Sequence, residues 1–245
     1  MVATAALVVL AGLWVLADPA ALGARPATCL PTGCFCERVA ATGSAQPANA
    51  WSSLAFLPAA LAVAVRARRM PTGIPERVLS WGLGAALLAV GIGSLALHAT
   101  LTYAGQLLDL QGMYLVTLVL GVGALARSGR LGPAPARAWT VGAVVLLAAS
   151  QYLLPGTRRW LFAVVLAGAL VAEVAGRGWS RPLRASLLTL AVAYAGWLAD
   201  DRHVWCAPTS WWQGHALWHL LTALAGFLLV EHYVVTSEGR AHVRR

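Results

Sequence analysis

The chain has 245 residues, of which 59% are hydrophobic and only 11% are charged. A soluble domain carries about 25% charged residues, so this composition excludes a soluble globular protein and indicates an integral membrane protein. All 18 basic residues are arginines, and they give the chain a formal net charge of +9. The arginines fall in short gaps between apolar runs, where they are typical of membrane topology signals and not of a nucleic-acid interface.

Eight apolar runs are long enough, or nearly long enough, to span a bilayer as helices. In chain order they lie at 3–18, 50–66, 78–100, 107–127, 138–154, 159–175, 184–200 and 214–235. They predict an all-α fold: a polytopic membrane helix bundle with a seven-helix core and one extra N-terminal transmembrane helix.

The same pattern divides the chain into four parts. Residues 1–18 are expected to form the extra transmembrane helix, and residues 50–235 the seven-helix core. The segment 19–49 is rich in Pro, Cys and Gly and is expected to form a cap on the outer side. Residues 236–245 are expected to form a basic cytoplasmic tail.

The first run, 3–18, also fits the apolar core of a signal peptide. A signal peptide normally carries a basic residue before its apolar region, and no basic residue precedes this run. The sequence therefore favours a helix that is retained as a membrane anchor.

The distribution of arginines predicts the orientation. Thirteen of the 18 arginines lie in alternate gaps and in the tail, and the other five lie in the remaining gaps. By the positive-inside rule the arginine-rich side, with the C-terminus, is cytoplasmic. The segment 19–49 and the loops near 101–106 and 201–213 then face the periplasm, the cell exterior or a lumen.

All four cysteines lie on the predicted outer side; they are Cys29, Cys34, Cys36 and Cys206. An even number of cysteines in an oxidising compartment favours disulfides. The residues alone leave three pairings open, with four free thiols as the alternative.

Five polar residues interrupt the apolar runs at one depth near the outer side. Ser94 and His98 are four residues apart and share one helical face. Asp109 lies about one turn inside the next run, and His215 and His219, in GHALWH, are four apart at the start of the last run. A helix bundle can bring such residues together, and ionisable groups inside a membrane are costly and usually functional.

These residue types predict a metal-dependent hydrolase. Two histidines at i and i+4, with a third from a neighbouring helix, form the ligand set of a catalytic zinc site that keeps one position for water. Zinc lowers the pKa of such a water to about 7. Asp109 is then suited to accept its proton, and Ser94 to hydrogen-bond the water or the developing oxyanion. The products would be those of amide or ester hydrolysis.

Taken singly, these residues have simpler interpretations. An isolated intramembrane histidine such as His98 is often a hydrogen-bonding partner between helices. The His215 and His219 pair alone fits a membrane interface, and Asp109 alone fits a structural partner of an arginine or of the backbone. Five such residues at one depth favour a metal site instead.

The stretches GIGSLALHATLTYAGQLLDLQGM (91–113) and GHALWHLLTA (214–223) together resemble the alkaline ceramidases. This family is part of a larger group of seven-helix membrane hydrolases that includes the adiponectin-receptor-like and GPI-lipid remodelling proteins. The resemblance covers about residues 30–235. It implies hydrolysis of the amide of ceramide to a sphingoid base and a fatty acid.

The resemblance also implies roles for the five polar residues. In the family the matching residues form a zinc site, so His98, His215 and His219 are expected to bind Zn²⁺. Asp109 and Ser94 are expected to contact the water on the metal and to be catalytic.

The segment 30–53 resembles the start of the family's first core helix. Cys36 and Glu37 match a Cys-Glu step there, which implies a Cys36–Cys206 disulfide and leaves Cys29 and Cys34 as the second pair. Animal members hold calcium in an acidic site in this region.

A tight calcium site is not expected in this chain. Glu37 is the only carboxylate in the segment 19–49, and Gln46 and Asn49 are neutral. A hard cation usually takes more than one carboxylate. Glu37, Gln46 and Asn49 are expected instead to hydrogen-bond each other or polar atoms of a substrate; a helix cap with loop packing is the alternative.

The sequence therefore predicts a zinc-dependent membrane hydrolase of ceramide or a ceramide-like N-acyl lipid, with no nucleic-acid partner. One alternative is a hydrolase of another lipid ester or amide. The other is a non-catalytic, zinc-containing receptor of the adiponectin-receptor-like kind. The presence of both Asp109 and Ser94 favours an enzyme, because metal binding alone requires neither.

Overall fold

The computed structural model describes residues 25–243, and the predicted helix at 1–18 lies outside them. The described chain is helical and contains no strand, only an isolated bridge between Pro26 and Thr102. Its 3₁₀ helices are η1 (Leu30–Thr32), η2 (Ser53–Ala55) and η3 (Pro155–Thr157). Its α-helices are α3 (Pro47–Ser52), α4 (Phe56–Arg69), α5 (Pro75–Thr100), α6 (Tyr103–Arg127), α7 (Pro133–Leu153), α8 (Arg158–Arg177), α9 (Arg181–Asp201) and α10 (Gly214–Val243).

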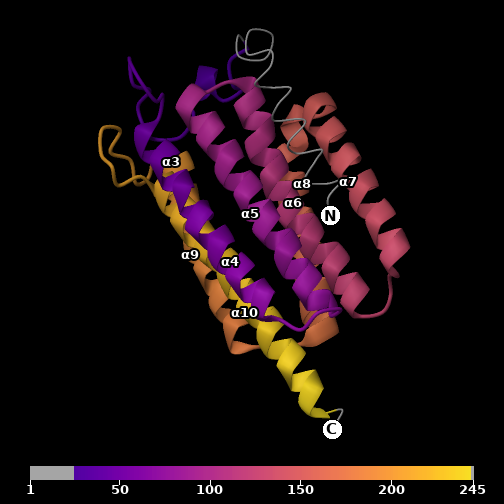
Figure 1. Ribbon diagram of the computed structural model, residues 1–245. Helices are drawn as coiled ribbons and strands as arrows, with labels where there is room; N and C mark the ends of the chain where they lie inside the picture. Colours follow the sequence, from indigo (N-terminus) through magenta and orange to yellow (C-terminus); the bar gives the residue numbers. More distant parts are fainter. Residues whose placement is uncertain (1–24, 244–245) are drawn as a thin grey trace.

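The long helices α4 to α10 run side by side as a bundle (Figure 1). The segment 25–46 and the loop 202–213 lie at one end, here called the cap end, and the last turns of α10 project from the opposite end. Backbone bonds join the two parts of the cap end; Arg38 N, for example, donates to Pro208 O at 2.9 Å.

Six helical segments of the described chain are long and apolar enough to cross a membrane. They are Pro47–Arg69, Pro75–Thr100, Tyr103–Arg127, Pro155–Arg177, Arg181–Asp201 and Gly214–Ser237. The protein is thus a multi-pass membrane helix bundle, as its sequence predicts. The seventh long helix, α7, does not reach the same hydropathy, because Arg137 and Gln151 lie among its 21 residues.

Small residues allow α5 and α6 to pack with their backbones in contact. A Cβ atom on Gly93 would lie 2.6 Å from the backbone nitrogen of Asp109. Gly105 against Leu97, and Gly112 on α6 against α5, are equally close. Such close approach is typical of membrane helix pairs with small residues at the interface. It sets Ser94 and Asp109 side by side on neighbouring helices.

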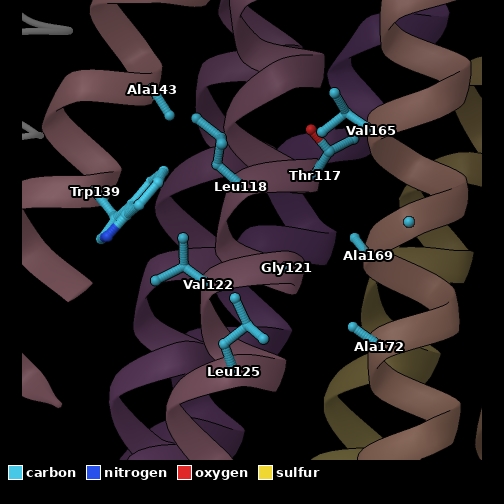
Figure 2. A pocket seen from close by; sticks show the side chains of 11 residues that line it. Thr117, Leu118, Gly121, Val122, Leu125, Trp139, Ala143, Val165, Ala169 and Ala172 are labelled. Carbon is cyan, nitrogen blue, oxygen red and sulfur yellow. The ribbon is translucent and has the colours of Figure 1, made fainter. Parts of the chain in front are cut away.

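An apolar groove of about 270 Å³ lies between α6, α7 and α8 (Figure 2). Leu118, Trp139, Val165 and Ala169 are among its lining side chains. None of the polar residues singled out in the sequence lines it, so this groove is separate from the predicted site.

A buried polar network joins helices at the end opposite the cap. Glu173 of α8 pairs with Arg127 of α6, and both side chains are fully buried. The second oxygen of Glu173 lies 2.8 Å from Nε2 of His232 on α10. Nδ1 of His232 lies 2.8 Å from the hydroxyl of Ser180, which caps α9. His232 is therefore a partner of this network and lies away from the other histidines of α10.

Candidate metal centre

Three histidines converge inside the bundle near the cap end. His98 comes from the last turns of α5, and His215 and His219 from the first turns of α10. Each offers a ring nitrogen, and these nitrogens lie within 4.8 Å of one another. The Nε2 atoms of His98 and His215 are 3.0 Å apart. All three side chains are buried, with at most 4% of each residue exposed.

The tautomer of His98 follows from its partner Gln46. The Gln46 amide nitrogen donates to two backbone carbonyl oxygens, those of Cys34 and Glu37. Its oxygen Oε1 is then the atom that faces Nδ1 of His98, at 2.8 Å. Because Oε1 only accepts hydrogen bonds, Nδ1 carries the proton and Nε2 presents a lone pair.

The tautomer of His219 follows in the same way from Ser52. The Ser52 hydroxyl donates to the carbonyl oxygen of Asn49 at 2.9 Å. It can therefore only accept from Nδ1 of His219, which lies 2.8 Å away. Nε2 of His219 is left with a lone pair, which faces the Ser94 hydroxyl at 2.9 Å.

This donor set fits a transition-metal ion. Two neutral imidazoles with oriented lone pairs and a third imidazole beside them are the ligands of a three-histidine zinc site. The hydrogen bonds to Nδ1 of His98 and His219 are the outer contacts that usually fix metal-binding histidines. The structure thus brings together the three residues that the sequence predicts as ligands.

The predicted catalytic residues lie next to the histidines. The Ser94 hydroxyl is fully buried and bonds His219. The Asp109 carboxyl group lies near the Ser94 hydroxyl, close enough for the two side chains to interact. Ser94 on α5 and Asp109 on α6 therefore border the three histidines. Their proximity depends on the close glycine-mediated packing of these two helices.

The three polar residues predicted around the site are joined by hydrogen bonds through Glu37, but their side chains have different partners. Gln46 is the partner of His98. The Glu37 carboxylate accepts the backbone N–H groups of Ala48 and Asn49, at 2.7 and 2.9 Å, at the start of α3. Burial raises the pKa of this carboxyl group above its usual value, and the two N–H donors oppose the shift. The Asn49 side chain is buried, and neither of its polar atoms has a partner in the described chain.

The residues near Glu37 do not fit a calcium ion. Calcium takes six to eight oxygen ligands, usually with several carboxylates. Both oxygens of Glu37 accept backbone hydrogen bonds, and the Gln46 oxygen accepts from His98. Among the side-chain oxygens of Glu37, Gln46 and Asn49, only Asn49 Oδ1 has no hydrogen bond, and one amide oxygen beside a single carboxylate falls far short of a calcium ligand set.

Asp200 is a site residue that sequence reasoning missed. It is fully buried, and its two oxygens accept from Cys36 N at 2.8 Å and from His215 N at 3.0 Å. It therefore joins the cap segment to the first turn of α10. The available signal is a pair of acidic residues, Asp200 and Asp201, at the end of the apolar run that precedes the loop 202–213 and GHALWH.

Two disulfides lie at the cap end, Cys29–Cys34 and Cys36–Cys206. These are the pairs that the family resemblance implies. Phe35 lies between them in sequence, and its ring is stacked on the imidazole of His215. Sequence reasoning gave Phe35 no role.

Fold and site together define a class: a multi-pass helical membrane protein with a buried three-histidine cluster that could hold a metal ion. Comparison with protein families gives the particular family. The model of the family described as Ceramidase matches residues 32–242, so the chain belongs to the ceramidase family. The search of curated proteins found no match.

Proposed function

We propose that the protein is a zinc-dependent membrane hydrolase that cleaves the amide bond of ceramide or a ceramide-like N-acyl lipid. The products are a long-chain base and a fatty acid. The convergence of three histidines with Ser94 and Asp109, in a chain of the ceramidase family, carries the proposal.

His98, His215 and His219 would hold the metal through ring nitrogens. When bound, Zn²⁺ supplies a Lewis acid and a water of lowered pKa to this site. Gln46 and Ser52 keep two of the rings oriented through their Nδ1 atoms. Imidazole sites also suit other transition metals, so metal analysis belongs to the test.

Asp109 is the proposed proton carrier. Its carboxylate accepts a proton from the attacking water as the new C–O bond forms at the amide carbon. It then delivers this proton to the amine nitrogen as the C–N bond breaks, which regenerates the carboxylate. The Ser94 hydroxyl donates a hydrogen bond to the carbonyl oxygen, where negative charge develops.

The site is proposed to lie nearer the outer face of the membrane, with the C-terminus in the cytoplasm. The arginine distribution supports this orientation. The disulfides support it independently, because Cys36–Cys206 lies at the cap end beside His215, and disulfides persist in oxidising compartments. The polar head of a lipid would meet the site from that side, and its apolar tails would extend toward the membrane interior.

The test uses protein purified in detergent, with metal content and fatty-acid release measured on a panel of ceramides and of lipid esters. We expect about one zinc per chain and release from ceramides. His215→Ala should abolish both, whereas His203→Ala, an exposed histidine of the neighbouring loop, should change neither. Zinc without release from any lipid would favour the non-catalytic receptor alternative. Fatty-acid release only from lipid esters would favour the alternative of an ester hydrolase. A wild-type protein without bound metal would overturn the proposal.

A further inference from the structure

The ring of Phe35 covers the imidazole of His215. The two ring centroids are 3.7 Å apart and the planes differ by 27°, so the rings are stacked. The centroid of His98 is 5.5 Å from that of Phe35. Phe35 therefore lies directly against two of the three histidines of the cluster.

His215 lacks the contact that orients the other two histidines. Nδ1 of His98 has Gln46 as partner, and Nδ1 of His219 has Ser52. Nδ1 of His215 is buried and has no hydrogen-bond partner in the described part of the chain. Histidines that bind metals almost always use this second nitrogen in a hydrogen bond that fixes the ring. Some other contact must fix the ring of His215.

Asp200 holds the backbone of His215 but leaves its side chain free to rotate. The bond from His215 N to Asp200 fixes where the residue sits at the start of α10. A hydrogen bond to the backbone nitrogen does not restrict rotation of the imidazole about χ2. This sp³–sp² torsion is also intrinsically broad. A flat aromatic ring stacked on one face does restrict that rotation.

The backbone of Phe35 is itself strained and strongly held. Its φ of 69° lies in the left-handed region, which is unfavourable for a bulky residue. Such a conformation persists only where the surroundings impose it. Here both neighbours are anchored: Cys34 and Cys36 each form a disulfide. The Cys34 carbonyl also accepts from Gln46, and Cys36 N donates to Asp200.

We propose that Phe35 is a positioning residue of the metal site, which fixes the ring of His215 so that its Nε2 faces Nε2 of His98. The two disulfides hold Phe35 in the left-handed conformation that this stack requires. The inference rests on the proposed function only in one respect, that the three histidines bind a metal.

The experiment measures metal binding, not turnover, in full-length protein with intact disulfides. Zinc affinity is obtained by competition with a chromogenic chelator, and ligand geometry from the absorption spectrum of the Co²⁺-loaded protein. Phe35→Leu keeps an apolar side chain but removes the flat ring, so zinc affinity should fall about 10- to 100-fold and the Co²⁺ bands should shift. Phe35→Tyr keeps the ring and should retain both wild-type values.

Phe56→Leu is the matched control. Phe56 is a buried core residue that meets His219 edge-on, with centroids 6.2 Å apart. Its substitution should lower the thermal midpoint of the metal-free protein without weakening zinc binding. Phe35→Leu should show the converse, weaker zinc binding with a smaller change in that midpoint.

The outcomes separate this inference from the proposed function. Wild-type binding with unchanged affinity and spectrum in Phe35→Leu would overturn the role of Phe35 and leave the metal site standing. A loss of zinc affinity in Phe35→Tyr as large as that in Phe35→Leu would overturn the stacking argument, because the tyrosine keeps the ring. If Phe35→Leu does not fold, the zinc affinity of Phe35→Tyr alone tests the role of Phe35. A wild type that binds neither zinc nor cobalt would overturn both proposals.

Discussion

The side-chain oxygen of Gln46 lies 2.8 Å from Nδ1 of His98, and this contact joins the cap to the histidine cluster. The amide nitrogen of Gln46 is bound to carbonyl oxygens of the cap at Cys34 and Glu37. One neutral side chain therefore holds two cap residues and sets the tautomer of a histidine on α5.

Gln46→Leu should weaken zinc binding about 10- to 100-fold, because His98 loses the acceptor that orients its ring. Gln46→Glu retains an acceptor oxygen for Nδ1 and should keep more of the zinc affinity than Gln46→Leu, although both variants lose the hydrogen bonds that the amide nitrogen donates to Cys34 O and Glu37 O. Gln106→Leu is the control, because Gln106 bonds Thr28 at the cap end without touching a histidine. Chelator competition measures all three; equal affinities for the Leu and Glu variants at position 46 would contradict the role of the oxygen.

Asp200→Asn should lower both stability and zinc affinity. An asparagine has only one acceptor oxygen, and its NH₂ group would face either Cys36 N or His215 N. Because both of these are donors, one of the two hydrogen bonds would be lost. A hydrogen bond to a charged group contributes about 1.5–3 kcal/mol, so a loss of this size is expected in the free energy of unfolding.

Asp201→Asn is the matched control for this change. Asp201 pairs with Arg159, whose side chain is 60% exposed, and an exposed ion pair contributes about 0–1 kcal/mol. Thermal unfolding and chelator competition on both variants test the contrast. Similar effects of the two substitutions would show that Asp200 does not link the cap to α10.

The histidine cluster could be predicted from the sequence because its signals are local. Spacing of four places two histidines on one helical face, and apolar runs give the depth of each residue in the membrane. Asp200 and Phe35 carry no such signal. Asp200 stands at a helix end beside Asp201, where either carboxylate fits a membrane interface. Its contact with Cys36 spans 164 residues and exists only because the folded cap lies against α10.

The boundaries of the elements show the same limit. Hydropathy predicts the first core run at 50–66, yet α3 begins at Pro47, because the Glu37 carboxylate accepts N–H groups of its first turn. Hydropathy predicts the last run at 214–235, whereas α10 continues to Val243 through polar residues. Hydropathy marks the part of a helix that lies in lipid, not the turns beyond it.

The two disulfides should differ in their contribution to stability. Cys29–Cys34 closes a loop with a sequence separation of 5, and Cys36–Cys206 one with a separation of 170. On the chain-entropy model, the longer loop contributes about 3 kcal/mol more. The double variant Cys36→Ala with Cys206→Ala should therefore unfold at a clearly lower temperature than Cys29→Ala with Cys34→Ala. The reverse order would show that the short loop is held by more than its closure.

Gly93→Ala should disrupt the contact between α5 and α6. The added Cβ would lie 2.6 Å from backbone atoms of Leu108 and Asp109, which cannot move aside as a flexible side chain could. The helices must separate, so Ser94 and Asp109 lose their proximity, and both thermal midpoint and fatty-acid release should fall. Gly82→Ala is the control on the same helix, since its Cβ would meet Val119 at an ordinary 3.5 Å. Equal tolerance of the two substitutions would contradict the close packing.

Glu173→Gln should destabilise the fold without affecting the metal site. The change removes the carboxylate of the fully buried ion pair between Glu173 and Arg127, and breaking a buried ion pair costs about 3–5 kcal/mol. Glu231→Gln is the control. Glu231 pairs with the partly exposed Arg66, and an exposed pair contributes about 0–1 kcal/mol. Thermal unfolding should therefore separate the two variants, while zinc content per folded chain stays at the wild-type value in both. A loss of zinc in Glu173→Gln would show that the two ends of the bundle are coupled, because its network contacts α10 at His232.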